Sequence, residues 1–230
     1  LLIKTGNGFT EKIAQKIHYH YINKYKACWV PDADGQTNLA GNLSHPGIFP
    51  KVPIKYLGPL SRFEKKETAF KYDLCILLSG PEPQRTIFEK MLLAELENYN
   101  GRGILVRGLP GESNINPALP ENVEIHNHLS AANLNEVLLQ SELIICRSGY
   151  TTVMDLIKLQ KKAILIPTPG QTEQEYLASH LQQKKLFFCA SQEIFSLEDV
   201  LKKSGNFIFE HINFPQNNFE AVVENFILNS

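Results

Sequence analysis

The stretch Cys146–Asp155 (CRSGYTTVMD) carries the residue types and the spacing best suited to chemistry. It follows the apolar run Leu143–Ile145, which is short, rich in β-branched residues and typical of a buried strand. Ser148 is a suitable N-cap and Gly149 permits close backbone approach, so a helix is predicted to begin here. The N-terminus of such a helix offers backbone N–H groups and the positive end of the helix dipole, which together can bind a phosphate.

Two polar side chains in this stretch share one face of the predicted helix. Thr151 and Asp155 are four residues apart, which places the carboxylate one turn after the hydroxyl. The hydroxyl can hold a phosphate and the carboxylate can hold a sugar diol. The same residues also fit an ordinary strand-to-helix turn with a solvated aspartate, and the stretch alone leaves both interpretations open.

A second loop, Ser79–Arg85 (SGPEPQR), also follows an apolar run. Gly80 gives it the character of a phosphate-binding turn, although it has neither a Gly-x-Gly-x-x-Gly nor a Walker pattern. Arg85, at the start of the next predicted helix, can pair with a phosphate or can be an ordinary surface arginine.

A third loop, Thr168–Glu175, also ends a predicted strand and begins a predicted helix. Gln174 and Glu175 place an amide beside a carboxylate, and this combination of donor and acceptors suits sugar hydroxyls. The alternative is a capping box, in which Glu175 serves only the backbone of Thr172.

The elements that position these loops alternate from residue 72 onward. The predicted strands are 74–78, 103–107, 123–127, 143–146, 163–167 and 186–189. The predicted helices are 86–96, 131–140, 150–160, 172–185 and 196–203. Such alternation favours an α/β fold, with a Rossmann-like parallel sheet and helices on both faces. Ligands bind at the carboxyl ends of such strands, so the three loops should meet there, joined by Asn127–Ser130 with Leu129.

The composition of the chain excludes several classes of protein. The 230 residues carry a net charge of −1 without a Lys/Arg cluster, which argues against a dedicated nucleic-acid binder. The four cysteines are widely spaced and show no zinc pattern, which fits a reducing compartment. No apolar run approaches the roughly 18 residues of a spanning helix, and no signal peptide is visible. Because the chain begins with Leu1 inside structured sequence, we expect a fragment of a longer protein.

The motifs together resemble the C-terminal domain of family-28 glycosyltransferases, over roughly residues 72–203. They are Ile145–Gly149, Thr152, Asp155, Ile166-Pro167 and Gln174–Tyr176. This family includes the N-acetylglucosaminyltransferase of peptidoglycan lipid synthesis. The resemblance implies a GT-B architecture, with two Rossmann-like domains facing across a cleft. Residues 1–60 would then be the tail of the N-terminal, acceptor-side domain and a linker, 61–213 the nucleotide-sugar-binding domain, and 214–230 a crossover helix.

The predicted donor site consists of Gly80, Arg85, Leu129, Ser148, Gly149, Tyr150, Thr151, Thr152, Asp155, Gln174 and Glu175. The resemblance assigns the ribose to Asp155, the diphosphate to the residues 149–152, and the sugar to Gln174 and Glu175. The turn 79–84 would face the phosphates and Leu129 would touch the base. The chain departs from the family in three ways: the ribose acid is Asp rather than the usual Glu, the first loop is less rich in Gly and Ser, and Gln-Glu replaces Gln-Gln or Asp-Gln. These departures leave the donor sugar unidentified.

The implied function is hexosyl transfer from a UDP-sugar to an acceptor hydroxyl, without a metal and without a cofactor beyond the donor substrate. By analogy the acceptor is lipid-linked, and the setting is the cytoplasm at the inner face of the membrane, contacted through the N-terminal domain. The catalytic base is unknown, because the family's N-terminal glycine loop and its His are absent, and we expect this chain alone to be inactive. Two alternatives remain open: a non-catalytic nucleotide-sugar-binding subunit that needs a partner, and a UDP-sugar epimerase or hydrolase on the same fold.

Overall fold

The chain forms two compact units. The computed structural model describes residues 1–111, 117–212 and 219–228. The first unit comprises Leu1–Leu60 and Ile212–Ser230, and the second comprises Ser61–His211. The predicted boundary between residues 213 and 214 lies outside the described residues.

The second unit is built around a parallel sheet. Its strands are β3 (Tyr72–Leu77), β4 (Gly103–Val106), β5 (Val123–His126), β6 (Ser141–Cys146), β7 (Lys162–Leu165) and β8 (Phe188–Cys189). They are ordered β5-β4-β3-β6-β7-β8, and every neighbouring pair is parallel. The chain therefore runs outward in both directions from β3 and β6, which makes this pair the topological switch point. This arrangement confirms the predicted Rossmann-like α/β fold.

The register aligns the carboxyl ends of the central strands. Leu77 of β3 lies opposite Val106 of β4 and Cys146 of β6, and Cys146 lies opposite Leu165 of β7. The loops that follow these strands consequently leave the sheet along one edge, as the sequence predicted.

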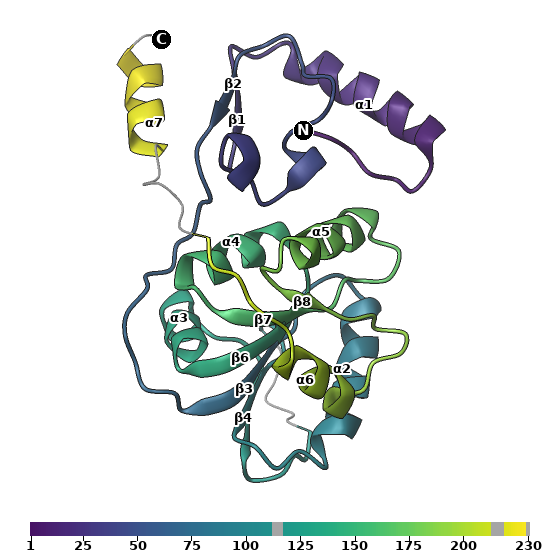
Figure 1. Cartoon of the computed structure of the whole chain (residues 1–230), viewed down its shortest axis with the longest axis vertical. Helices are drawn as coiled ribbons and strands as arrows, with labels where there is room; N and C mark the ends of the chain where they lie inside the picture. The colour runs from purple at the N-terminus through teal and green to yellow at the C-terminus, as the bar shows by residue number, and fades with distance from the viewer. Residues whose placement is uncertain (112–116, 213–218, 229–230) are drawn as a thin grey trace. The chain divides into compact units, whose positions relative to one another are not determined.

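Helices cover both faces of the sheet, and Figure 1 shows α3, α4 and α5 on one face and α2 and α6 on the other. Their bounds are α2 (Gln84–Leu96), α3 (Ala131–Leu139), α4 (Tyr150–Leu159), α5 (Thr172–Gln183) and α6 (Leu197–Gly205). This division follows from right-handed crossovers, which place helices on opposite faces when the chain moves in opposite directions across the sheet. The core beneath α2 and α6 joins strand residues such as Ile76 and Ile145 to Phe88 and Leu92 of α2.

The last strand is shorter than predicted. The sequence indicated a strand over 186–189, whereas β8 contains only Phe188 and Cys189. The reason is the end of α5, where Lys185 adopts a left-handed φ of 57° and Leu186 N–H donates to the Leu181 carbonyl. These residues close the helix and cannot pair with β7.

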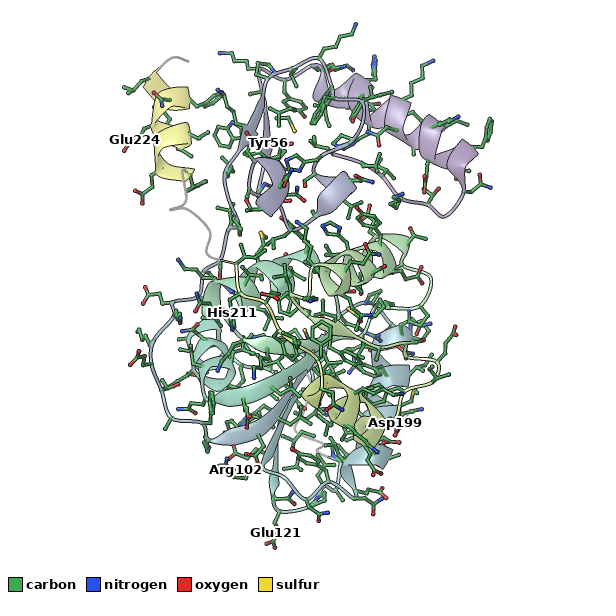
Figure 2. All side chains as sticks on the ribbon, in the orientation of Figure 1. Tyr56, Arg102, Glu121, Asp199, His211 and Glu224 are labelled. Carbon is green, nitrogen blue, oxygen red and sulfur yellow. The ribbon has the colours of Figure 1, made fainter. Side chains whose placement is uncertain are left out.

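The edge where the strands begin carries exposed ion pairs. Arg102, directly before β4, pairs with Asp73 in β3, and Figure 2 shows Arg102 and Glu121 at this edge. An exposed pair of this kind contributes about 0–1 kcal/mol.

The first unit contains α1 (Gly8–Ile22), β1 (Cys28–Val30), β2 (Ile54–Tyr56) and α7 (Phe219–Leu228), with short 3-10 turns at Gly35–Thr37 and Gly41–Leu43. Strands β1 and β2 pair in parallel. Helix α1 begins at Gly8, where the Asn7 side chain accepts a hydrogen bond from Phe9 N–H and caps the helix. Among the residues that the structure describes, no helix has both the length and the apolar composition that crossing a bilayer requires.

Candidate functional site

The predicted loops leave adjacent strands at the switch point, and specific contacts join them. The first follows β3, the second lies between β6 and α4, and the third connects β7 to α5. A Cβ on Gly80 of the first loop would lie 3.9 Å from Thr168 Oγ1 of the third. Ser148 Oγ of the second loop donates to the Gln174 carbonyl at 2.9 Å. The three loops therefore form one contiguous surface at the carboxyl edge of the sheet.

Helix α4 begins at this surface without a side-chain cap. Its N-cap is Gly149, in an extended conformation (φ −69°, ψ 135°), so the prediction of Ser148 as N-cap is wrong. Ser148 is fully buried, because its hydroxyl points to the first turn of α5 instead. Thr151 is exposed and Tyr150 and Thr152 are half-buried, which leaves the first turn of α4 accessible to an anion.

Asp155 lies one turn further along α4 and is more enclosed than the sequence indicated. It is 8% exposed, and its Oδ1 accepts a hydrogen bond of 2.6 Å from Ser61 Oγ. Burial raises the pKa of its carboxyl above the ordinary 3.8, although the bond from Ser61 and the charge of Arg62 act in the opposite direction. Ser61 was not predicted as a site residue. It lies 94 positions away in the chain, and no motif marks it.

Gln174 and Glu175 both shape the third loop. Gln174 Oε1 accepts from Thr168 N–H at 3.0 Å, and its Nε2 donates to Gln171 Oε1. Glu175 Oε1 accepts from Gly170 N–H at 2.9 Å. The N-cap of α5 is Gln171, so the predicted capping box between Thr172 and Glu175 is wrong. Glu175 stays exposed and can contact a ligand while it supports the loop.

Arg85 is neither a surface arginine nor available to a phosphate. It is 6% exposed and pairs with Glu82 at 2.6 Å and with Glu89 at 3.1 Å. A phosphate could engage the guanidinium only by displacing these carboxylates, one of which is buried. We therefore correct the predicted site by leaving out Arg85.

The same buried carboxylate connects α2 to the loop after β5. Glu89 also pairs with Arg107, and Arg107 Nη1 donates to Asn127 Oδ1 at 2.8 Å. Asn127 begins the loop that carries Leu129, which is half-buried and accessible to an apolar ring. The ion-pair network thus fixes the loop at which the base was predicted to bind.

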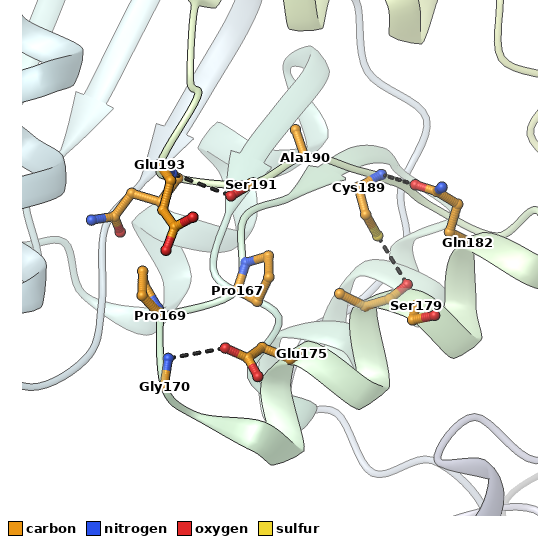
Figure 3. A pocket seen from close by; sticks show the side chains of 12 residues that line it. Pro167, Pro169, Gly170, Glu175, Ser179, Gln182, Cys189, Ala190, Ser191 and Glu193 are labelled. Atoms are coloured by element: carbon orange, nitrogen blue, oxygen red, sulfur yellow. Dashed lines mark hydrogen bonds between the residues drawn. The ribbon is translucent and has the colours of Figure 1, made fainter. Parts of the chain in front are cut away.

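A cavity of about 450 Å³ opens beside the third loop. Figure 3 shows Glu175 directed toward Gly170, with Glu193 on the loop after β8. Carboxylate, amide and hydroxyl groups line this cavity together with Pro167, Pro169 and Ala178. Such a lining suits a neutral polyhydroxyl group better than an anion, because the carboxylates would repel negative charge.

Known proteins resemble this chain in sequence and in structure. Residues 113–225 match the glycosyltransferase family 28 C-terminal domain. The match includes the loops before α4 and α5 but not the one before α2. A curated relative is the UDP-N-acetylglucosamine–N-acetylmuramyl-(pentapeptide) pyrophosphoryl-undecaprenol N-acetylglucosamine transferase of Haemophilus ducreyi. It is 27% identical over 151 residues, which span 63% of this chain and 42% of the relative.

Solved structures share the fold. The glycosyltransferase of kitacinnamycin superposes with a TM-score of 0.56 at 14% identity, covering 86% of this chain and 57% of that one. MurG of Acinetobacter baumannii gives a TM-score of 0.51 at 16% identity, covering 89% of this chain and 66% of that one. These similarities place the second unit in the GT-B architecture. The chain spans well under two thirds of the length of the curated relative that it matches.

Proposed function

We propose that the second unit binds the UDP-sugar donor of a hexosyl transfer reaction, since residues 113–225 match the glycosyltransferase family 28 C-terminal domain. The observation that carries the proposal is the uncapped N-terminus of α4 at the switch point, enclosed by the loops after β3 and β7. This is where an open parallel sheet binds nucleotides.

The diphosphate would lie against the first turn of α4. Gly149 allows close approach, and the backbone N–H groups there, with the hydroxyls of Thr151 and Thr152, would donate to phosphate oxygens. When the bond to the sugar breaks, negative charge develops on the departing diphosphate. The helix dipole and these donors would stabilise that charge.

The rest of the donor would extend to both sides of α4. Asp155 would accept a hydrogen bond from a ribose hydroxyl through Oδ2, since Ser61 occupies Oδ1. Gln174 and Glu175 would hold the sugar, and Leu129 would contact the base. The acceptor would supply the attacking hydroxyl. The name of the curated relative specifies a pyrophosphoryl-undecaprenol acceptor, which is lipid-linked. We propose an acceptor of the same class for this chain, at the inner face of the membrane.

Calorimetric titration with UDP tests this proposal. Wild type should bind UDP, and Asp155→Ala should weaken binding about tenfold to 150-fold, since a hydrogen bond to a charged group contributes about 1.5–3 kcal/mol. Glu142→Ala is the matched control, because Glu142 is an exposed carboxylate in β6 near the opposite edge of the sheet. Absence of UDP binding by folded wild type, or equal weakening by both variants, would refute the assignment.

A further inference from the structure

Arg147 occupies an unusual environment directly before Ser148. It is 2% exposed. Its guanidinium donates to the carbonyls of Gln84 at 3.1 Å, Ile166 at 3.2 Å and Pro167 at 3.3 Å. It also lies over the ring of Phe88, 4.5 Å from the centroid. All of these partners are neutral.

The carbonyls that Arg147 binds belong to the loops of the candidate site. Gln84 lies in the first loop and is the first residue of α2, and Ile166 and Pro167 connect β7 to the third loop. Arg147 itself lies in the second loop. One side chain therefore holds the three loops together from inside the protein.

The charge of Arg147 has no counterion among the described residues. This distinguishes it from Arg85 and Arg107, which share the buried carboxylate of Glu89. Burial lowers the pKa of the Arg147 guanidinium to about 10, so the group remains a cation at neutral pH. An unpaired buried charge is costly, and its field is weakly screened because little water surrounds it. The positive charge thus adds to that of the α4 N-terminus at the same carboxyl edge of the sheet.

We propose that Arg147 is a positioning residue that also supplies charge to the donor site. Its side chain fixes the three loops, and its unpaired cation raises the affinity of the site for the donor diphosphate without touching it. This inference rests on the proposed function, since it requires that the site bind a diphosphate.

The test compares UDP with uridine, because only UDP carries the charge that Arg147 would attract. Dissociation constants for both ligands are measured by calorimetry for wild type, Arg147→Gln and Arg147→Lys. Arg147→Gln should weaken the binding of UDP about tenfold more than the binding of uridine. This is the order of magnitude expected when one unit charge acts at roughly 10 Å through protein. Arg147→Lys keeps the charge and should retain the wild-type ratio of UDP to uridine affinity within about threefold.

Lys161→Gln is the matched control. Lys161 is also a half-buried cation that donates to two carbonyls, those of Leu139 at 2.6 Å and Ser141 at 2.7 Å, and it lies over the ring of Phe70. It is located near the opposite edge of the sheet, where β6 and β7 begin. Its replacement should leave the ratio of UDP to uridine affinity unchanged.

Equal weakening of UDP and uridine by Arg147→Gln would show a purely structural role and overturn the proposal, as would an unchanged UDP affinity. If Arg147→Gln does not fold, Arg147→Met serves as the neutral variant. A folded Arg147→Lys variant that loses the preference for UDP over uridine would also overturn the proposal. Failure of wild type to bind UDP would instead refute the proposed function itself.

Discussion

Replacement of Phe88 by leucine isolates what an aromatic ring contributes beneath the candidate site. Phe88 is 1% exposed, and its ring contacts the Arg147 cation at 4.5 Å and meets Phe195 edge to face at 5.3 Å. Leucine would keep most of the apolar contact but lose both ring interactions. Phe187→Leu is the matched control, since Phe187 is also 1% exposed and has no ring or cation partner in the part of the chain that the structure describes.

The expected magnitude follows from these contacts. A hydrophobic swap of similar size costs up to about 1.5 kcal/mol, and both variants share this term. The aromatic pair adds about 0.5–1.5 kcal/mol. A desolvated cation–π contact adds about 2 kcal/mol. Phe88→Leu should therefore lower the free energy of unfolding by about 2.5–3.5 kcal/mol more than Phe187→Leu does.

Urea unfolding followed by far-UV circular dichroism measures this difference. Tryptophan fluorescence is unsuitable, because the single tryptophan, Trp29, lies in the first unit whereas both phenylalanines lie in the second. The double variant Phe88→Leu/Arg147→Met should lose less free energy of unfolding than the sum of the losses in the two single variants, because each substitution removes the same cation–π contact. If the two phenylalanine variants are equally stable within about 0.5 kcal/mol, the assigned ring energies are wrong.

Two further predictions concern backbone conformation and pH. Gly108→Ala should lower the free energy of unfolding in urea by about 1–3 kcal/mol more than Gly170→Ala does. Both glycines have a positive φ, 70° and 80°, but only a Cβ at Gly108 would collide with a neighbour, the Leu78 carbonyl oxygen at 2.4 Å. Equal costs would contradict that clash. The stability of Asp155→Asn relative to wild type should increase as the pH rises above 3.8. Burial raises the pKa of the Asp155 carboxyl in the folded state, so the folded protein holds this proton more tightly than the unfolded chain does. Ionisation of Asp155 at higher pH therefore destabilises wild type, whereas the asparagine variant has no such proton to lose. Thermal melts of both proteins across the pH range measure this, and a difference independent of pH would contradict it.

The sequence was sufficient for the fold because the information there is local. Each central strand is a short apolar run that ends in a Gly, Pro or Ser turn, and such runs can be buried only in a sheet covered on both faces. The alternation with helices then determines that the strands are parallel. The strand predicted over 186–189 is too long, because the turn that closes α5 includes a left-handed Lys185 and Leu186.

The hydrogen-bond and ion-pair partners of the site side chains were harder to predict, because these partners are distant in sequence and only the tertiary fold brings them close. Ser148 is a good N-cap by type, yet its hydroxyl donates to the Gln174 carbonyl, which lies 26 positions away. Arg85 was expected at a phosphate, but two carboxylates lie closer. Ser61, the partner of Asp155, belongs to a polar segment without any motif. In each case the local pattern identified a polar role and the tertiary structure decided the partner.

The ion-pair network also accounts for the loop that departs most from the family pattern. A first loop rich in Gly and Ser would leave Arg85 paired with Glu89 alone, whereas here Glu82 supplies a second carboxylate. With Arg107 as the other partner of Glu89, the network contains two cations and two anions. This balance makes the Glu82 loop consistent with the same scaffold. Arg147 lies outside this balanced network, and no carboxylate in the described part of the chain pairs with its charge.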